Sequence, residues 1–396
     1  MKRVYLASAL TCIFILALFN AWFHFLDPAA TLSTLKVGFI YDNDESTPYT
    51  YNFSLAKDAL EKKYGDRVEI LTRSNVLDDQ MEEPLRDLAE AGCNIIFLNG
   101  YSTQVIALAP EYPGTEFCQA SYEDMSGKDV PQNYHTFKGK IYQGRYVSGI
   151  AAGMKLDELI SQNVIGADQA IIGFVAAYPT TEVISGFTAF LLGVRSVVPQ
   201  AVMRVKYTES WSSYSRELSA ARGLIEEGCV ILSQHTDTIG PAVACEESTR
   251  PVFHVAYNQS MTEVAPTASL VCSRINWEPY VVGAVEAVMS RKRIEAVVPG
   301  RVHGSDMSAG FESGWVEVLE LNQQSAAEGT QEAMDAAIAR FRREKGNDDF
   351  VFRGEYVGVN PNNPADTSDL RNGFVENEFC SHPSFGYILS DIITID

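Results

Sequence analysis

The stretch LAEAGCNIIFLN (residues 88–99) returns later in the chain as LIEEGCVILSQ (residues 224–234). Both copies place a glycine and a cysteine between a helix-like segment and a short apolar run, and Gly92 and Gly228 stand 136 residues apart. Apolar, β-branched-rich runs of this length predict strands that are buried on both faces of a parallel sheet. The recurrence indicates that one structural unit occurs twice.

Two further pairs of segments keep almost the same spacing. VGFIY matches IGFVAAY, with Gly38 and Gly173 separated by 135 residues. EFCQASY matches VFHVAY, with Phe117 and Phe253 separated by 136 residues. Three landmarks at near-constant separation predict an internal duplication that covers about two thirds of the chain.

Each copy alternates apolar strands with amphipathic helices, which predicts an α/β fold of two Rossmann-like lobes, each with a parallel sheet and right-handed crossovers. A chain of 396 residues is also too long for one ordinary core. The expected division is an N-terminal segment at 1–30, a first lobe at 36–142 and 258–304, and a second lobe at 143–257 and 305–396.

The loops that follow the predicted strands are the candidate ligand site, because open α/β sheets bind ligands beyond the carboxyl ends of their strands. These loops are YDNDESTPYTYN (41–52), NGYSTQ (99–104), AYPTTEV (177–183), SQHTDT (233–238) and AYNQSM (256–261). Since they come from both copies, we expect one cleft between two hinged lobes that close on a small molecule.

The charge balance narrows the class of partner. With 31 basic and 51 acidic residues, the chain carries a net charge of -20, which repels a phosphate backbone and argues against nucleic-acid binding. A hydrophobic content of 46% and a charged content of 21% are those of a folded globular protein.

The N-terminus predicts export. Lys2 and Arg3 precede an uncharged run at residues 4–25, long enough for a helix to cross a hydrocarbon layer of roughly 30 Å, with the basic end inside. The run suits an uncleaved membrane anchor better than a cleaved signal peptide, and either places the rest of the chain outside the cytoplasm. Cys12 lacks the preceding small residue of a lipoprotein signal, so lipidation is not expected.

The seven cysteines show no CxxC pair and no histidine spacing that suits zinc, so we expect neither a metal nor a cofactor. Cys93, Cys118 and Cys229 lie in apolar runs and are expected to be small buried side chains. A disulfide remains open for a protein outside the cytoplasm.

Seven segments together resemble the basic membrane protein family, the substrate-binding components of ABC importers that include the purine nucleoside receptor. They are TYNFSLAKDAL, NYHTFKGKIYQGRYVSGIAAGMK, GFVAAYPTTEVISGFTAFLLGVRSVVP, ESWSSYSRE, SQHTDTIGPA, AYNQSMTEVAP and RINWEPYVVGAVEAV, and the resemblance covers residues 35–396. It implies a type I periplasmic-binding-protein fold that holds a purine nucleobase or nucleoside between its lobes. It also implies ABC permease and ATPase subunits as partners.

The resemblance further implies a pair of aromatic side chains that hold the base. Tyr51 with Asn52 fits the family's aromatic–asparagine pair on the first helix, and Trp211 stands where the facing aromatic is expected. Two rings suit a flat, weakly hydrated base because stacking contributes roughly 1–3 kcal/mol per base.

Two departures from the family bear on the sugar. Asn258 stands where many members carry aspartate for the ribose hydroxyls, and Ile275 replaces a lysine that contacts ribose. Both changes favour a free base or another planar ligand over a nucleoside, although Asp237 remains able to accept a hydrogen bond from a hydroxyl. Trp277 matches a subgroup marked by an N-W-x-P motif, and it equally fits a core position.

The complete set of expected ligand residues is Thr47, Tyr49, Tyr51, Asn52, Tyr101, Glu182, Trp211, Thr236, Asp237, Asn258 and Trp277. Tyr51 also fits packing under its loop, and Glu182 also fits a helix N-terminus, whose dipole favours a negative charge. Two further classes of function stay open: a membrane-anchored sensor that signals to a partner protein, and a hydrolase. Ser233, His235 and Asp237 stand two residues apart on an extended segment and do not meet as nucleophile and base, so we expect no enzyme.

Overall fold

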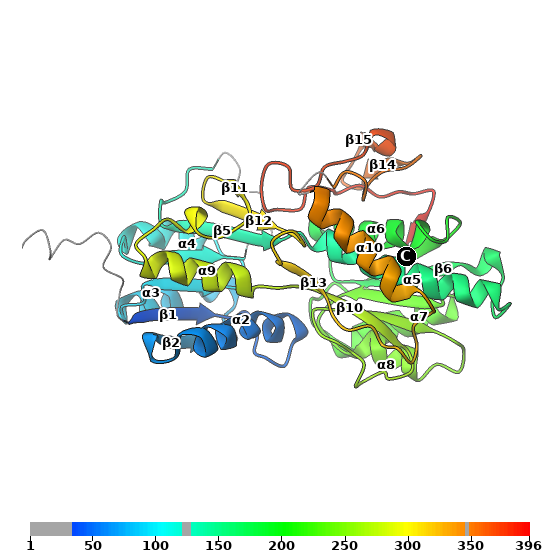
Figure 1. The fold of residues 1–396 in the computed structure, drawn as a ribbon, viewed down its shortest axis with the longest axis horizontal. Helices are drawn as coiled ribbons and strands as arrows, with labels where there is room; N and C mark the ends of the chain where they lie inside the picture. The colour runs from blue at the N-terminus through cyan, green and yellow to red at the C-terminus, as the bar shows by residue number, and fades with distance from the viewer. Residues whose placement is uncertain (1–33, 121–127, 345–347) are drawn as a thin grey trace, which may run out of the picture.

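The computed structural model describes residues 34–120, 128–344 and 348–396, and it forms two lobes that lie side by side along the long axis (Figure 1). Each lobe is built on one seven-stranded sheet. The predicted N-terminal membrane segment falls on residues 1–30, outside the described residues. Within the described ranges, no helix is both long enough and apolar enough to cross a membrane.

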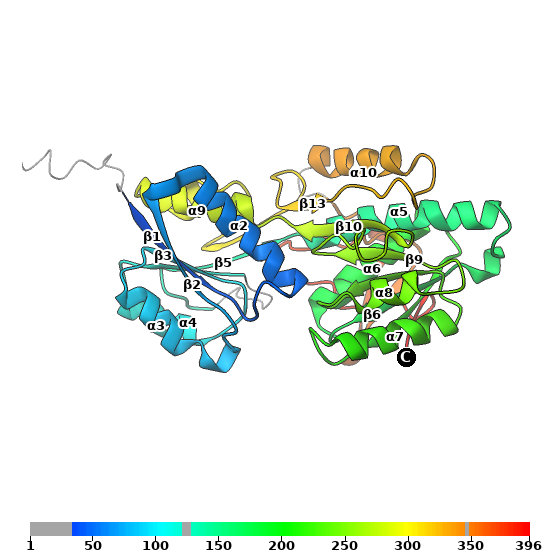
Figure 2. The ribbon, with the colours of Figure 1, turned by 90° about the horizontal axis from the view of Figure 1, so that it is seen from below.

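The first sheet has the order β11-β12-β5-β4-β3-β1-β2. Its strands are β1 (Leu35–Ile40), β2 (Val68–Arg73), β3 (Ile95–Leu98), β4 (Glu116–Gln119), β5 (Tyr134–Gly139), β11 (Arg301–His303) and β12 (Asp306–Ala309). Helices α2 (Pro48–Tyr64) and α9 (Glu278–Met289) cover one face, and α3 (Glu82–Glu90) and α4 (Gln104–Leu108) cover the other (Figure 2). The strands are therefore buried on both sides.

The second sheet has the order β13-β10-β9-β8-β6-β7-β16. Its strands are β6 (Ile171–Ala176), β7 (Val202–Tyr207), β8 (Ile231–His235), β9 (Phe253–Tyr257), β10 (Ser269–Ile275), β13 (Val316–Val318) and β16 (Ile393–Ile395). Helices α5 (Ile141–Ser161) and α6 (Thr181–Arg195) share one hydrophobic core with α10 (Thr330–Glu344), and α7 (Tyr214–Glu226) and α8 (Gly240–Glu246) share another. After α10, the chain forms a hairpin of β14 (Val357–Asn360) and β15 (Asn363–Asp369).

The predicted duplication is visible in the strand order. The parallel series β2-β1-β3-β4-β5 in the first lobe corresponds to β7-β6-β8-β9-β10 in the second. Gly92 and Gly228 have φ angles of 84° and 96°, a left-handed conformation that glycine adopts without steric cost. Each ends the helix before a central strand, which explains why the glycine recurs in both copies.

The chain crosses between the lobes after β5, after β10 and after β12, and these crossing segments pack tightly together. The amide of Asn276 donates to the carbonyl oxygen of Trp315 at 2.8 Å. A Cβ atom on Gly139 would lie 2.6 Å from Ile275, so only glycine fits this contact. The three crossings form the hinge of the molecule.

Two of the predicted lobe boundaries are wrong. Strand β10 belongs to the second sheet, whereas the range 258–304 assigned it to the first lobe. Strand β12 belongs to the first sheet, whereas the range 305–396 assigned it to the second lobe. The physical reason is that the duplicated unit has a fifth parallel strand, so each copy completes its own sheet before the chain crosses.

The C-terminal part of the chain contacts both lobes. We call residues 374–388 the C-terminal strap. In the first lobe, Asp306 accepts from the amide of Ser381 at 2.6 Å. In the second lobe, Ser185 of α6 donates to the buried carboxylate of Glu376 at 2.7 Å. The chain then ends in β16, which pairs in parallel with β7.

Six cysteines fall in the described residues; all six are buried, and no disulfide joins any two of them. Cys93, Cys118 and Cys229 pack in apolar surroundings, as predicted. Burial raises the pKa of the Cys93 thiol to about 11 and that of Cys229 to about 12, so both remain protonated.

Candidate functional site

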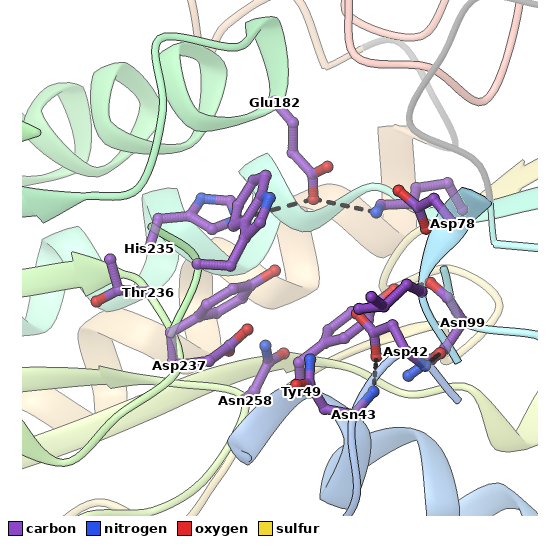
Figure 3. Close-up of a pocket in the computed structure, with 14 residues that line it drawn as sticks. Asp42, Asn43, Tyr49, Asp78, Asn99, Glu182, His235, Thr236, Asp237 and Asn258 are labelled. Carbon is purple, nitrogen blue, oxygen red and sulfur yellow. Dashed lines mark hydrogen bonds and ion pairs between the residues drawn. The ribbon is translucent and has the colours of Figure 1, made fainter. Parts of the chain in front are cut away.

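A cavity of about 240 Å³ lies between the lobes at the carboxyl ends of the strands (Figure 3). Its lining comes from both lobes: Asp42, Asn43, Tyr49, Leu77, Asp78, Asn99, Lys138, Glu182, Trp211, His235, Thr236, Asp237, Tyr257 and Asn258. All five loops chosen from the sequence contribute to it. The position agrees with the rule that open α/β sheets bind ligands at this edge.

The side of the cavity from the first lobe is held by hydrogen bonds between neighbouring loops. The amide of Asp42, just after β1, donates to Oδ1 of Asn99, just after β3, at 2.9 Å. Thr50 donates to Oδ1 of Asp42 at 3.2 Å, and the hydroxyl of Tyr49 donates to the carbonyl oxygen of Asn99 at 2.9 Å. Adjacent parallel strands bring these loops together, and the bonds fix Asp42 and Tyr49 at the cavity wall.

The side from the second lobe is held in a similar way. Glu182 lies in the first turn of α6, where the helix dipole favours its charge. The amide of Asp237 donates to the carbonyl oxygen of Trp211 at 2.8 Å, which ties the loop after β8 to the loop after β7. Asn258 follows β9 and has a φ angle of 64°, so its side chain leaves the strand at a sharp turn.

An ion pair joins the two lobes inside the cleft. Nζ of Lys138, on β5, lies 3.1 Å from Oε1 of Glu182, and the side chains are 2% and 8% exposed. Nε2 of His235 lies 3.7 Å from the same oxygen. Figure 3 shows Glu182 pointing from its helix into the cavity, on the side of His235.

Aromatic rings form much of the wall. The rings of Tyr257 and His235 meet edge to face with centroids 4.6 Å apart, and the centroid of Trp211 lies 6.3 Å from that of His235. Trp211 also contacts Tyr178 edge to face at 5.5 Å. Tyr49 adds a ring from the first lobe and lies across the cavity from His235 in Figure 3.

Carboxylates dominate the charge of the cavity. Burial raises the pKa of Asp42 and, with the help of Asp42, that of Asp78. Burial and the neighbouring carboxylates raise the pKa of Asp237 well above its ordinary value, although a hydrogen bond from Asn258 opposes the shift. These carboxyl groups repel one another when charged, and burial leaves them poorly hydrated. A ligand that donates hydrogen bonds to them would offset both costs.

Six of the expected ligand residues line this cavity: Tyr49, Glu182, Trp211, Thr236, Asp237 and Asn258. Tyr51 does not. It is 38% exposed and lines a separate groove between α2 and the segments at 258–263 and 319–324. Two residues along a helix turn the side chain by about 200°, so Tyr49 and Tyr51 leave α2 on opposite sides.

The other four expected residues also lie outside the cavity lining. Asn52 is buried and donates to the carbonyl oxygen of Ile275 at 2.8 Å, so it braces the hinge. Trp277 is in the core of the first lobe, 4.9 Å from the ring of Phe53. The hydroxyl of Thr47 donates to the carbonyl oxygen of Asp44 at 3.3 Å, and Tyr101 is half-buried beside its loop.

Eight lining residues were missed among the expected ligand residues. Asp42, Asn43, Asn99, His235 and Tyr257 stand in or at the ends of the chosen loops, so their loops were identified without the individual side chains. Leu77 and Asp78 follow β2, an edge strand whose end was not considered. Lys138 could have been identified from the sequence, because a lysine within an otherwise buried strand needs a partner.

The arrangement does not support hydrolysis by Ser233, His235 and Asp237. Ser233 is buried and donates its hydroxyl to the carbonyl oxygen of Val255 at 2.9 Å. Across residues 34–120, 128–344 and 348–396, no group of three or more histidine, cysteine, aspartate or glutamate side chains is arranged to hold a metal ion.

Comparison with known proteins places this cavity in context. A family model described as ABC transporter substrate-binding protein PnrA-like matches residues 30–340. A purine-binding protein of Brucella abortus (strain 2308) is 29% identical over 259 residues, which cover 64% of this chain and 69% of the relative. A putative ABC transporter glucose-binding protein of Haloferax volcanii is 29% identical over 235 residues, which cover 59% of this chain and 55% of the relative.

The fold is similar to that of solved solute-binding proteins. An ABC transporter solute-binding protein from Conexibacter woesei superposes with a TM-score of 0.59 at 18% sequence identity, covering 79% of this chain and 97% of that chain. At this identity the likeness concerns the fold alone. It confirms the α/β architecture predicted from the duplication.

Proposed function

Because the chain belongs to the Bmp family of PnrA-like ABC transporter substrate-binding proteins, we propose that its interlobe cavity captures a purine nucleobase or nucleoside for import. Members of this family are transport components that bind solutes outside the cytoplasm and work with permease and ATPase subunits. The apolar run in residues 1–30 would export the protein or anchor it to the membrane.

One observation carries the proposal: the cavity combines aromatic rings from both lobes with carboxylates and amides. Tyr49 stands on one side, and Trp211 and Tyr257 stand on the other. Rings on two sides suit a flat heterocycle, because its faces are weakly hydrated and its edges carry the polar groups. Polar wall residues are needed because a buried edge group left without a partner costs about 1–3 kcal/mol.

The polar groups of the cavity suit the edges of a purine. Asp42, Asp78 and Asp237 accept hydrogen bonds from ring N–H and amino groups, and Asn43 supplies an amide for either kind of edge atom. Four carboxyl groups line the cavity and its one lysine is paired with Glu182, which disfavours a phosphate group, so nucleotides are expected to bind weakly. The expected ligand is therefore a base or a nucleoside, without phosphate.

The purine-binding relative supports this ligand class, and the glucose-binding relative gives a second candidate. Sugars also bind between aromatic faces and carboxylates, which accept from their hydroxyls. The family resemblance implies a ribose-contacting lysine at position 275. Ile275 is instead buried and apolar and does not line the cavity, so this contact is lost, which favours a base over a sugar.

The test is a calorimetric titration of the exported part of the chain with adenine, guanine, hypoxanthine, adenosine, inosine, glucose and AMP. We expect at least one purine base or nucleoside to bind, and AMP and glucose to bind far more weakly. Glucose binding without purine binding would replace the proposal with the sugar alternative. Native mass spectrometry of freshly purified protein would then identify any small molecule that the cavity retains.

A further inference from the structure

Among the residues that the structure describes, Arg145 is a buried cation without a hydrogen-bonding partner. It lies in the second turn of α5, just after the first crossing between the lobes, and its exposure is 0%. None of its three guanidinium nitrogens has a partner among the described residues. A buried charge in this state costs stability, so its presence needs a functional or structural reason.

The guanidinium lies behind the wall of the ligand cavity. Its Cζ atom is 3.7 Å from the ring centroid of Tyr257 and 5.7 Å from that of Phe174. Tyr257 lines the cavity, and its ring touches that of His235 edge to face. Arg145 therefore supports the cavity from outside through a cation–π contact.

Helix α6 passes close to both Arg145 and His235. A Cβ atom on Gly186 would lie 3.2 Å from Nδ1 of His235 and 3.8 Å from Nε of Arg145. Nδ1 of His235 is buried and has no hydrogen-bonding partner within the described part of the chain. Glycine at this position gives room to two nitrogen-bearing groups that would repel each other if both were charged.

The charges around His235 come from three other elements and from the end of its own strand. Glu182 on α6 is 3.7 Å away, Lys138 is on β5, Arg145 is on α5, and Asp237 follows β8. Tyr257 contributes a neutral ring from β9. Burial, Arg145 and Lys138, in that order, lower the pKa of His235 well below its ordinary value.

Arg145 itself remains the charged partner of the two. Burial lowers its pKa to about 10, and the nearby tyrosine, thiol and carboxylates oppose that shift. At neutral pH the guanidinium is protonated and the imidazole is not. The part of the cavity wall that Tyr257 and His235 form is therefore uncharged, and the cation of Arg145 lies behind it.

We propose that Arg145 is a positioning residue of the ligand cavity, which holds the Tyr257 ring in place against a flat ligand and presents its charge to His235 from behind the wall. The residue does not line the cavity, so its effect on the ligand passes through Tyr257 and His235. The proposal rests on the proposed function only for the choice of purine as the probe.

The first measurement needs no ligand. The ring protons of His235 are followed by NMR between pH 5 and 8 in the wild type, Arg145→Met and Arg145→Lys, with a His235→Gln variant to assign the signal among six histidines. We expect His235 to stay neutral in the wild type and in Arg145→Lys. In Arg145→Met we expect its titration to move to higher pH, because one of the two nearby cations is gone.

The second measurement is the affinity for adenine. We expect Arg145→Met to bind about tenfold more weakly, in keeping with the loss of a desolvated cation–π contact. Arg145→Lys keeps the charge without the planar stack and is expected to lose several-fold. The matched control is Arg340→Met, since Cζ of Arg340 lies 3.6 Å from the ring of Phe350 on the surface of the second lobe, far from the cavity.

Thermal unfolding separates positioning from a structural role. Replacing an unpaired buried cation by an apolar side chain of similar size is expected to leave the melting temperature unchanged or raise it. Weaker binding in Arg145→Met at an unchanged or higher melting temperature supports the proposal. Wild-type affinity and wild-type His235 titration in Arg145→Met would overturn it, as would an affinity that falls only together with the melting temperature.

Two other outcomes are also decisive. If Arg145→Met does not fold, Arg145→Lys carries the binding test, and wild-type affinity in that variant contradicts the proposal. If the wild type binds no purine, the proposed function fails, while the titration of His235 still decides whether Arg145 sets the charge of the wall.

Discussion

Lys138 of the first lobe and Glu182 of the second form an ion pair of 3.1 Å inside the cleft. The lysine lies one residue before the end of the strand that leads into the hinge, and the glutamate lies in the first turn of the helix beside the cavity. Since both side chains are almost fully buried, the pair holds the lobes together at the place where a ligand would bind. Its strength therefore bears on the balance between open and closed forms.

Lys138→Met should favour the open form. Breaking a buried ion pair costs about 3–5 kcal/mol when the remaining charge stays buried, but opening of the cleft hydrates Glu182 and relieves that cost. We expect a larger radius of gyration for the ligand-free variant in small-angle X-ray scattering. The control is Lys206→Met, which breaks a pair with Glu227 within the second lobe and should leave the radius unchanged. Equal radii for Lys138→Met and the wild type would show that the pair does not control opening.

Trp211→Ala should weaken purine binding about 5- to 150-fold, the loss expected from one stacked ring at roughly 1–3 kcal/mol. Tyr49→Ala should also weaken binding, because Tyr49 provides the ring of the facing lobe. Tyr51→Ala serves as the matched control, two residues along the same helix and outside the cavity. Calorimetry that found Tyr51→Ala weaker and Tyr49→Ala unchanged would restore the pair expected from the family resemblance.

Asp237→Asn should stabilise the ligand-free protein at pH 7. The pKa of Asp237 in the folded state is raised, chiefly by burial, so the folded state binds the proton more tightly than the unfolded state. Stability is then lost as the pH rises above the unfolded pKa, and an asparagine avoids that loss. Scanning calorimetry should show a higher melting temperature for the variant at pH 7 and a smaller difference near pH 4.

The exposed Asp58→Asn is the control for this series. It should shift the melting temperature little at either pH. A lower melting temperature of Asp237→Asn at pH 7 would contradict this prediction. It would show that the carboxylate of Asp237 stabilises the fold despite its burial and the nearby carboxylates.

His135→Gln should remove a pH-dependent part of the stability. Nδ1 of His135 is 2.7 Å from Glu295 and Nε2 is 2.9 Å from Glu116. Burial alone lowers the pKa of His135, but the two carboxylates together raise it above 6.5. Its contribution is complete below pH 6.5 and is lost as the pH rises through the raised value. The difference in melting temperature between wild type and variant should therefore shrink from pH 6 to pH 9, and a constant difference would contradict the charged triad.

The duplication allowed much of the fold to be predicted, because parallel strands and their following loops recur at one spacing. The same logic placed the cavity, since neighbouring strands bring their carboxyl ends to one edge. The repeat pattern does not show how helix α2 is rotated about its own axis. That rotation decides whether Tyr49 or Tyr51 faces the cavity. Trp277 was ambiguous for a related reason, because an apolar side chain beside a hinge suits the core and the cleft equally.

Charges between lobes were harder to predict. Lys138 and Glu182 are far apart in sequence, and their pairing depends on how closely the lobes approach each other. Arg145 stood in one of the segments that resembled the family, yet nothing in its sequence neighbours indicates that a ring of another strand lies against it.

The family-matched region ends at residue 340, but the second sheet does not. Its outermost strand, β16, is formed by the last residues of the chain and covers the flank of β7. A shortened protein that stops near residue 340 would expose the backbone of β7 to other chains, and such exposed strands promote aggregation. Recombinant protein should therefore retain β16 and its pairing with β7.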